Sequence, residues 1–95
     1  MKYQTTALQQ QPVKESIFKV YPNPAKEDFT LESSDNFDNP IITISDLLGK
    51  VVVHQKYFTR SKKLKIATAN LQEGMYVLNC FDKTHTIKSK IIIRH

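Results

Sequence analysis

The chain has 95 residues, of which 40% are hydrophobic and 24% are charged, and these values are ordinary for one soluble globular domain. So short a chain leaves little material for a deep active-site cleft, and no apolar run approaches the roughly 20 residues that a membrane-spanning helix needs. The formal net charge is +5, and segments 47–72 and 83–95 carry bases without a single acid. A basic face is typical of proteins that meet phosphates or an acidic partner, but lysines guarding strand edges give the same pattern.

Residues 1–16 have the composition of a linker. The run Gln9-Gln10-Gln11-Pro12 is polar and breaks any helix, so we expect a flexible, disordered lead followed by one domain over 17–95. Residues 1–6 also lack the hydrophobic segment of a signal peptide. The chain is therefore either cytosolic or one piece of a longer protein whose own N-terminus carried the signal.

From residue 17 onward the apolar residues alternate with polar ones, which is the period of a half-buried β-strand. Seven short stretches show this pattern, and none shows a sustained helical period. They are separated by turn residues at intervals of about 8–12 residues, which is typical of an all-β sandwich or barrel. The predicted strands cover 17–21, 28–32, 42–45, 51–53, 63–66, 75–81 and 85–94.

The same alternation predicts which side chains form the core. Ile92 lies out of phase with its neighbours, so we expect it to face away from the core as an edge or contact residue. Residues 33–40 are predicted to be a polar loop. The predicted core consists of Phe18, Val20, Phe29, Leu31, Ile42, Ile44, Val51, Ile66, Leu71, Tyr76, Leu78, Cys80, Ile87, Ile91 and Ile93.

Two turns have a specific chemistry. Asp46 precedes Leu47-Leu48-Gly49, where its carboxylate is expected to accept backbone N–H groups while Gly49 takes a positive φ. Gly74, ahead of the strand at 75–81, is the other expected left-handed position. Pro22 and Pro24 flank Asn23 and predict a stiff turn after the first strand.

The residues that usually carry catalysis or metal binding are scarce. His54, His85 and His95 lie far apart, and Cys80 is the single cysteine, so we expect no metal, no cofactor and no disulfide. Two glycines do not build a phosphate-binding loop, and no serine sits in a nucleophile elbow. Cys80 lies in an apolar stretch without a neighbouring base, and we expect a buried, unreactive thiol. We therefore expect a domain that is not an enzyme.

The order of four motifs carries a resemblance. The chain reads Y-P-N-P-A over 21–25, D-L-L-G-K over 46–50, G-M-Y over 74–76 and K-S-K-I-I-I-R over 88–94. Each motif alone is common, but the four in this order, over about 17–95, closely resemble the type A C-terminal sorting domain of the type IX secretion system of Bacteroidetes.

This resemblance implies a fold and a role. Such domains are Ig-like, seven-stranded antiparallel β-sandwiches that follow a large secreted parent protein. They direct its export from the periplasm through the type IX translocon in the outer membrane, and a sortase-like cysteine protease then removes the domain near its N-terminal border. The parent is afterwards attached to the cell surface or secreted.

The resemblance also assigns residues. The segment implied for recognition by the translocon consists of Lys88, Lys90, Ile91, Ile92, Ile93 and Arg94. The motif residues are Pro22, Asn23, Pro24, Asp46, Gly49, Lys50, Gly74 and Tyr76.

Alternatives from other classes stay open. An extracellular carbohydrate-binding or adhesin-like sandwich would present Tyr21, Tyr57 and Phe58 as one flat platform. A cytosolic nucleic-acid binder would use the same aromatics beside the bases at 60–63, although we expect no nucleic acid as partner. A homodimer through a free strand edge is also compatible with the sequence.

Overall fold

The computed structural model describes residues 17–95, and the predicted flexible lead at 1–16 lies outside the described residues. Residues 17–95 contain no helix long and apolar enough to cross a membrane. They form seven strands: β2 (Phe18–Tyr21), β3 (Asp28–Ser33), β4 (Ile41–Asp46), β5 (Val51–Lys56), β6 (Lys63–Ala67), β7 (Gly74–Phe81) and β8 (Thr86–Ile93).

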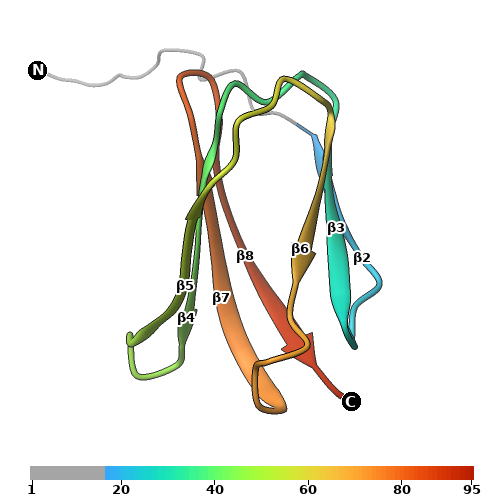
Figure 1. Cartoon of the computed structure of the whole chain (residues 1–95), viewed down its shortest axis with the longest axis vertical. Coiled ribbons are helices and arrows are strands. Elements are labelled where there is room, and N and C mark those ends of the chain that lie inside the picture. Colours follow the sequence, from blue (N-terminus) through green and yellow to red (C-terminus); the bar gives the residue numbers. More distant parts are fainter. Residues whose placement is uncertain (1–16) are drawn as a thin grey trace, which may run out of the picture.

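The strands form two sheets that pack face to face (Figure 1). The three-stranded sheet has the order β2-β3-β6, and the four-stranded sheet has the order β5-β4-β7-β8. All pairs within the sheets are antiparallel. This arrangement confirms the predicted Ig-like seven-stranded sandwich.

The core lies between the two sheets and follows the predicted alternation closely. Phe18, Val20 and Leu71 are partly buried at its margin. The predicted core residues that are fully enclosed are Phe29, Leu31, Ile42, Ile44, Ile66, Tyr76, Leu78, Cys80, Ile87, Ile91 and Ile93. Period-two alternation succeeds because one face of each sheet is covered and the other is not.

The prediction of Val51 as a core residue is wrong, since this side chain is 52% exposed. The register between β4 and β5 shifts, so that Ile44 pairs with Val53 while Ser45 pairs with Val51. The extra residue, Val52, is a β-bulge, and a bulge reverses which face the following residues occupy. Val53 therefore packs against the core in place of Val51.

The prediction of a polar loop at 33–40 is also incomplete. Phe37 has no exposed surface, and Ala25 and Leu64 are likewise buried although we did not predict them. The Phe37 amide donates to the Ser61 carbonyl at 2.9 Å, which ties this loop to the segment before β6. Phe37 and Ala25 lie outside the strands, where no periodicity indicates burial, whereas Leu64 alternates in phase with Ile66 on β6.

Candidate functional site

Among the strands of residues 17–95, the terminal strand β8 lies at the edge of the four-stranded sheet and pairs with β7 alone. Its side chains alternate strictly between the two faces. Ile91 and Ile93 are each 1% exposed and belong to the core, while Lys88 and Lys90 are exposed on the outer face. Ile92 faces outward and is partly exposed, as predicted. The segment implied for recognition is thus divided between the core and the surface.

As far as residues 17–95 are concerned, the free side of β8 is an open strand edge over most of its length. Ile92 directs its N–H and C=O away from β7, and residues two apart in an antiparallel strand point the same way. Thr86, Lys88 and Lys90 therefore present backbone groups along this edge. The Lys90 carbonyl accepts the Ser89 hydroxyl at 3.2 Å. Within the described residues, no other strand covers this part of β8.

The turn after β2 closes the far end of that edge. The Ala25 amide donates to the Ile92 carbonyl at 2.7 Å, and the Arg94 amide donates to the Ala25 carbonyl at 2.8 Å. The side-chain oxygen of Asn23 accepts the Ile92 amide at 3.0 Å. The peptide bonds before Pro22 and Pro24, on either side of Asn23, are both cis. The first and last motifs of the sequence are therefore in direct contact.

The residues beyond β8 are also held. The His95 amide donates to a Glu73 carboxylate oxygen at 2.9 Å, and the His95 ring nitrogen Nε2 lies 2.7 Å from the Leu71 carbonyl. A hollow of about 420 Å³ lies beside this end. It is lined by Pro22, Pro24, Lys26, Glu27, Asp28 and His95.

The central motif forms the hairpin between β4 and β5. Asp46 Oδ1 accepts the amides of Leu48 and Lys50, both at 2.9 Å, and the Asp46 carbonyl accepts the Gly49 amide at 3.0 Å. Gly49 has φ of 90°, a conformation that favours glycine. The Lys50 side chain is in solvent. This turn leaves Leu47 and Leu48 projecting, 63% and 95% exposed.

The G-x-Y motif begins β7. Gly74 has a positive φ of 155°, as predicted, a backbone conformation that favours glycine. Tyr76 is 7% exposed, and its hydroxyl donates to the Gln72 carbonyl at 2.6 Å. A buried tyrosine that ties down the preceding turn explains the aromatic in structural terms.

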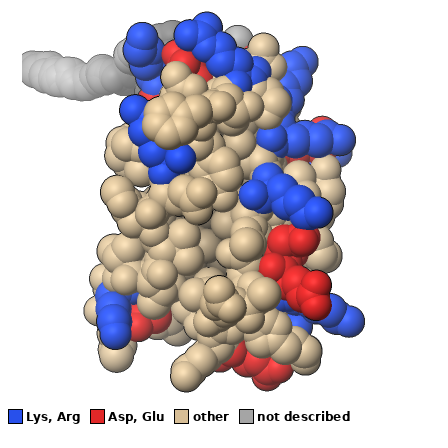
Figure 2. Space-filling view, viewed as in Figure 1, with Lys and Arg blue, Asp and Glu red and all other residues tan. Residues whose placement is uncertain are grey.

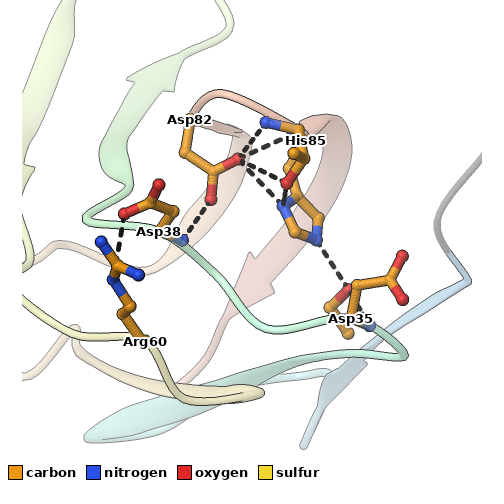
Figure 3. Close-up of polar contacts among 7 residues, drawn as sticks. Asp35, Asp38, Arg60, Asp82 and His85 are labelled. Carbon is orange, nitrogen blue, oxygen red and sulfur yellow. Dashed lines mark hydrogen bonds and ion pairs between the residues drawn. The ribbon is translucent and has the colours of Figure 1, made fainter.

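A buried polar cluster at the opposite end joins the two sheets (Figure 3). The His85 ring lies with Nδ1 2.9 Å from Asp82 Oδ1 and with Nε2 3.0 Å from the Ser33 hydroxyl. Ser33 ends β3 in one sheet, whereas Asp82 and His85 lie in the turn between β7 and β8 of the other. Sequence alone does not reveal this cluster, because Ser33 and His85 are 52 residues apart and no local pattern marks them.

The order serine, histidine, aspartate is that of a hydrolase triad, but the surroundings differ. Ser33 is 3% exposed, and its hydroxyl oxygen also accepts the Asp35 amide at 3.2 Å. A nucleophile has to reach a substrate carbonyl beside a set of oxyanion donors. The Ser33 hydroxyl is instead enclosed between two partners, and the Phe37 ring packs against His85 with centroids 4.8 Å apart. Ser33, His85 and Asp82 therefore form a structural cluster that ties the two sheets together, which we call the lock.

The carboxylate of Asp82 is the centre of this lock. Burial by itself would raise its pKa, but the N–H groups that the carboxylate accepts outweigh burial and hold the pKa below its ordinary value of 3.8. Asp82 Oδ2 accepts the Asp38 amide at 2.7 Å. Asp82 Oδ1 accepts the amides of Thr84 and His85 at 2.9 and 2.7 Å. Asp38 is in turn paired with Arg60, whose Nε lies 3.5 Å away.

Cys80 is a buried thiol, as predicted. Burial, reinforced by the negative charge of Asp82, raises its pKa to about 12. Residues 17–95 contain no group of three or more histidine, cysteine, aspartate or glutamate side chains placed to hold a metal ion.

Charged residues are unevenly distributed over the surface. Figure 2 shows lysine and arginine side chains gathered at the end where the loops 57–62 and 82–85 lie, while the middle of the same view is largely uncharged. The aromatic residues do not form a platform. Tyr21 ends β2 on the three-stranded sheet, where its hydroxyl donates to Glu32, whereas Tyr57 and Phe58 follow β5 and Tyr57 packs against the core.

The described residues thus form a two-sheet sandwich whose terminal strand is clamped by the turn at 22–25. The family model described as a secretion system C-terminal sorting domain matches residues 19–94. The chain therefore belongs to the family of type IX secretion C-terminal sorting domains. No curated protein matches the chain.

Membership in this family has direct consequences for function. A C-terminal sorting domain is a signal carried by a parent protein and used by the type IX secretion system. The chain accordingly serves export to the cell surface or secretion.

Proposed function

We propose that this domain is a non-catalytic sorting signal, which the type IX translocon recognises at the outer side of its terminal strand. In this proposal the folded domain passes through the periplasm with its parent. A sortase-like cysteine protease then cuts ahead of residue 17, and the parent is attached to the cell surface. The contacts are made by proteins and not by nucleic acid.

The observation that carries this proposal is the division of the terminal segment by the fold. Lys88 and Lys90 stand on the exposed face of an open-edged strand, whereas Ile91 and Ile93 are enclosed. A partner that reads the folded domain can reach the lysines, Arg94 and the outward side of Ile92. Exposed bases at an unpaired strand edge offer both charge and backbone hydrogen bonds to such a partner.

The test fuses the complete chain to the C-terminus of a periplasmic fluorescent protein in a Bacteroidetes host. We expect the fusion to leave the periplasm, and the Lys88→Glu, Lys90→Glu double variant to be retained. Lys62→Glu with Lys83→Glu makes the same change in net charge in exposed loops outside β8, and this control should be exported normally. Retention of the unaltered fusion would contradict the proposal. If the two double variants were exported equally, Lys88 and Lys90 would not be recognition residues and would only protect the edge of β8 from pairing with other strands.

The carbohydrate-binding alternative is not favoured by any observation on the molecule. It required Tyr21, Tyr57 and Phe58 on one open face. Tyr57 packs against the core, and Tyr21 donates its hydroxyl to Glu32 at 2.7 Å on the three-stranded sheet.

A further inference from the structure

The central strand β7 is apolar on both of its faces. Tyr76, Leu78 and Cys80 face the core and are buried. The outward positions are Met75, Val77, Asn79 and Phe81, of which Met75 and Phe81 are 45% and 47% exposed. An antiparallel sheet with one solvated face normally carries polar residues there, and a strand that is apolar on both faces is typical of a sheet covered on both sides.

The register extends this apolar character across the sheet. Met75 pairs with Ile92 on β8, and Phe81 pairs with Ile41 on β4. The hairpin that continues this sheet adds the exposed Leu47 and Leu48. These apolar side chains lie on both sides of a more polar middle, and exposed apolar surface gathered on one face marks an interaction site. We call the outward side of β5, β4, β7 and β8 the outer sheet face.

The charge on the outer sheet face is of one sign. Lys56, Lys88 and Lys90 lie on its strands and are exposed. Asp46 is the only acid within the four strands, and its carboxylate is occupied by the turn amides. A polar row crosses the middle of the face, where the register aligns His54, Thr43, Asn79 and Lys88.

We infer that the outer sheet face docks onto a protein surface that places acidic side chains opposite the lysines and the polar row, and apolar side chains on either side of them. This inference deepens the proposed function and rests on it, because it extends the translocon contact from β8 across the whole sheet. Carboxylates of the partner would neutralise the lysines, which gives specificity and orientation. A protein surface also supplies hydrogen-bond partners for Thr43 and Asn79, which cost free energy if they are covered without them.

Two other occupants fit less well. A second copy of this chain would bring Lys88 and Lys90 against the same lysines, and like charges placed together disfavour association. A lipid surface would leave the polar row against hydrocarbon without partners. Both remain as outcomes of the experiment.

The decisive pair of variants introduces a charge of either sign at one neutral position in the middle of the face. In the exported fusion, Asn79→Lys should leave export within about twofold of normal, whereas Asn79→Glu should reduce it by about tenfold or more, since like charges across an interface are strongly disfavoured. Asn79 pairs with Lys88, so folding favours glutamate over lysine at this position. A loss confined to the glutamate variant therefore cannot come from misfolding.

A second pair tests the apolar part. Phe81→Ser should reduce export, whereas Phe58→Ser, which alters an even more exposed phenylalanine in the loop after β5, should not. Thermal unfolding of the isolated chain should show that all four variants fold.

The outcomes separate the inference from the proposed function. Retention of the unaltered fusion overturns both. Normal export of the unaltered fusion together with Asn79→Glu and Phe81→Ser overturns the inference alone. The inference alone is also overturned if sedimentation equilibrium shows a dimer that Asn79→Glu abolishes. The same holds if the chain binds phosphatidylglycerol vesicles and Phe81→Ser abolishes that binding.

Discussion

Asp82 shows how one carboxylate can hold two sheets together. It accepts backbone N–H groups from its own turn and from the loop after β3, and it orients the His85 ring toward Ser33. A carboxylate that accepts several N–H groups is stabilised in its charged form. Folding and ionisation of Asp82 are therefore linked.

We predict that Asp82→Asn lowers the free energy of unfolding by about 1–3 kcal/mol near neutral pH, because the asparagine NH2 replaces one of the two acceptor oxygens and leaves buried N–H donors unpaired. Because the pKa of Asp82 is lower in the folded chain than its ordinary value of 3.8, its stabilising effect is complete above that value and is lost as the pH falls below it. Urea unfolding at a series of pH values should show the two proteins converging below about pH 4.

Glu27→Gln is the control for this experiment, since Glu27 is an exposed acid outside the lock. It should leave both the stability and its pH dependence close to those of the unaltered chain. A difference between Asp82→Asn and the unaltered chain that stayed constant down to pH values well below 3.8 would mean that Asp82 does not ionise in the way described.

The thiol of Cys80 gives a second prediction for a single residue. With a pKa of about 12 it is almost entirely protonated near pH 8, so the native thiol should react with an aromatic disulfide reagent about a thousandfold more slowly than the unfolded chain. The measurement compares labelling rates with and without urea. Rapid labelling under native conditions would show that the strand β7 opens readily.

At the scale of elements, the turn at 22–25 acts as a clamp on β8. Asn23→Ala removes the acceptor of the Ile92 amide, which lies at the surface, and should cost about 1 kcal/mol. Amide hydrogen exchange by NMR should show faster exchange at Ile92 and little change at Ile91, which faces β7. Asn70→Ala, in an exposed turn, is the matched control. Unchanged exchange at Ile92 in Asn23→Ala would show that the amides and carbonyls of Ala25 hold β8 without the asparagine.

The strands were the part of the fold most open to sequence prediction. Alternation identifies Leu31 and Leu78 as core residues because a sandwich covers one face of each strand. It fails at Val51, where a bulge shifts the register, and at Phe37, which lies in a loop without a period.

The site was predictable only in part for the same reason. Motif residues could be assigned by position, but the contact of Asn23 with Ile92 spans 69 residues and leaves no local signal. The same holds for the cluster of Ser33, Asp82 and His85. Both contacts depend on how the two sheets meet, which is decided by the whole fold.

At the scale of the molecule, the two sheets are joined at both ends. The cluster around Asp82 closes the end where β3 finishes, and the clamp of Ala25 on Ile93 closes the end where the chain leaves β8. The last residues of the domain thus belong to its core and to its closure as well as to its surface.

This dual role decides how a truncation should be interpreted. Removal of residues 91–95 deletes two enclosed isoleucines, each worth about 2–5 kcal/mol, together with the backbone bonds to the turn at 22–25. The sum is comparable with the whole stability of a small domain, about 5–15 kcal/mol. We predict that the truncated chain does not fold, as measured by loss of amide dispersion in NMR spectra and of a cooperative unfolding transition.

The Lys88→Glu, Lys90→Glu variant should instead keep a native spectrum, because both side chains are exposed. Failure of the truncated chain to be exported would then report loss of the fold, and failure of the charge-reversed chain would report loss of recognition. A truncated chain that kept its dispersion and its cooperative transition would contradict this view of β8. It would mean that Ile91 and Ile93 contribute far less to the core than their burial indicates.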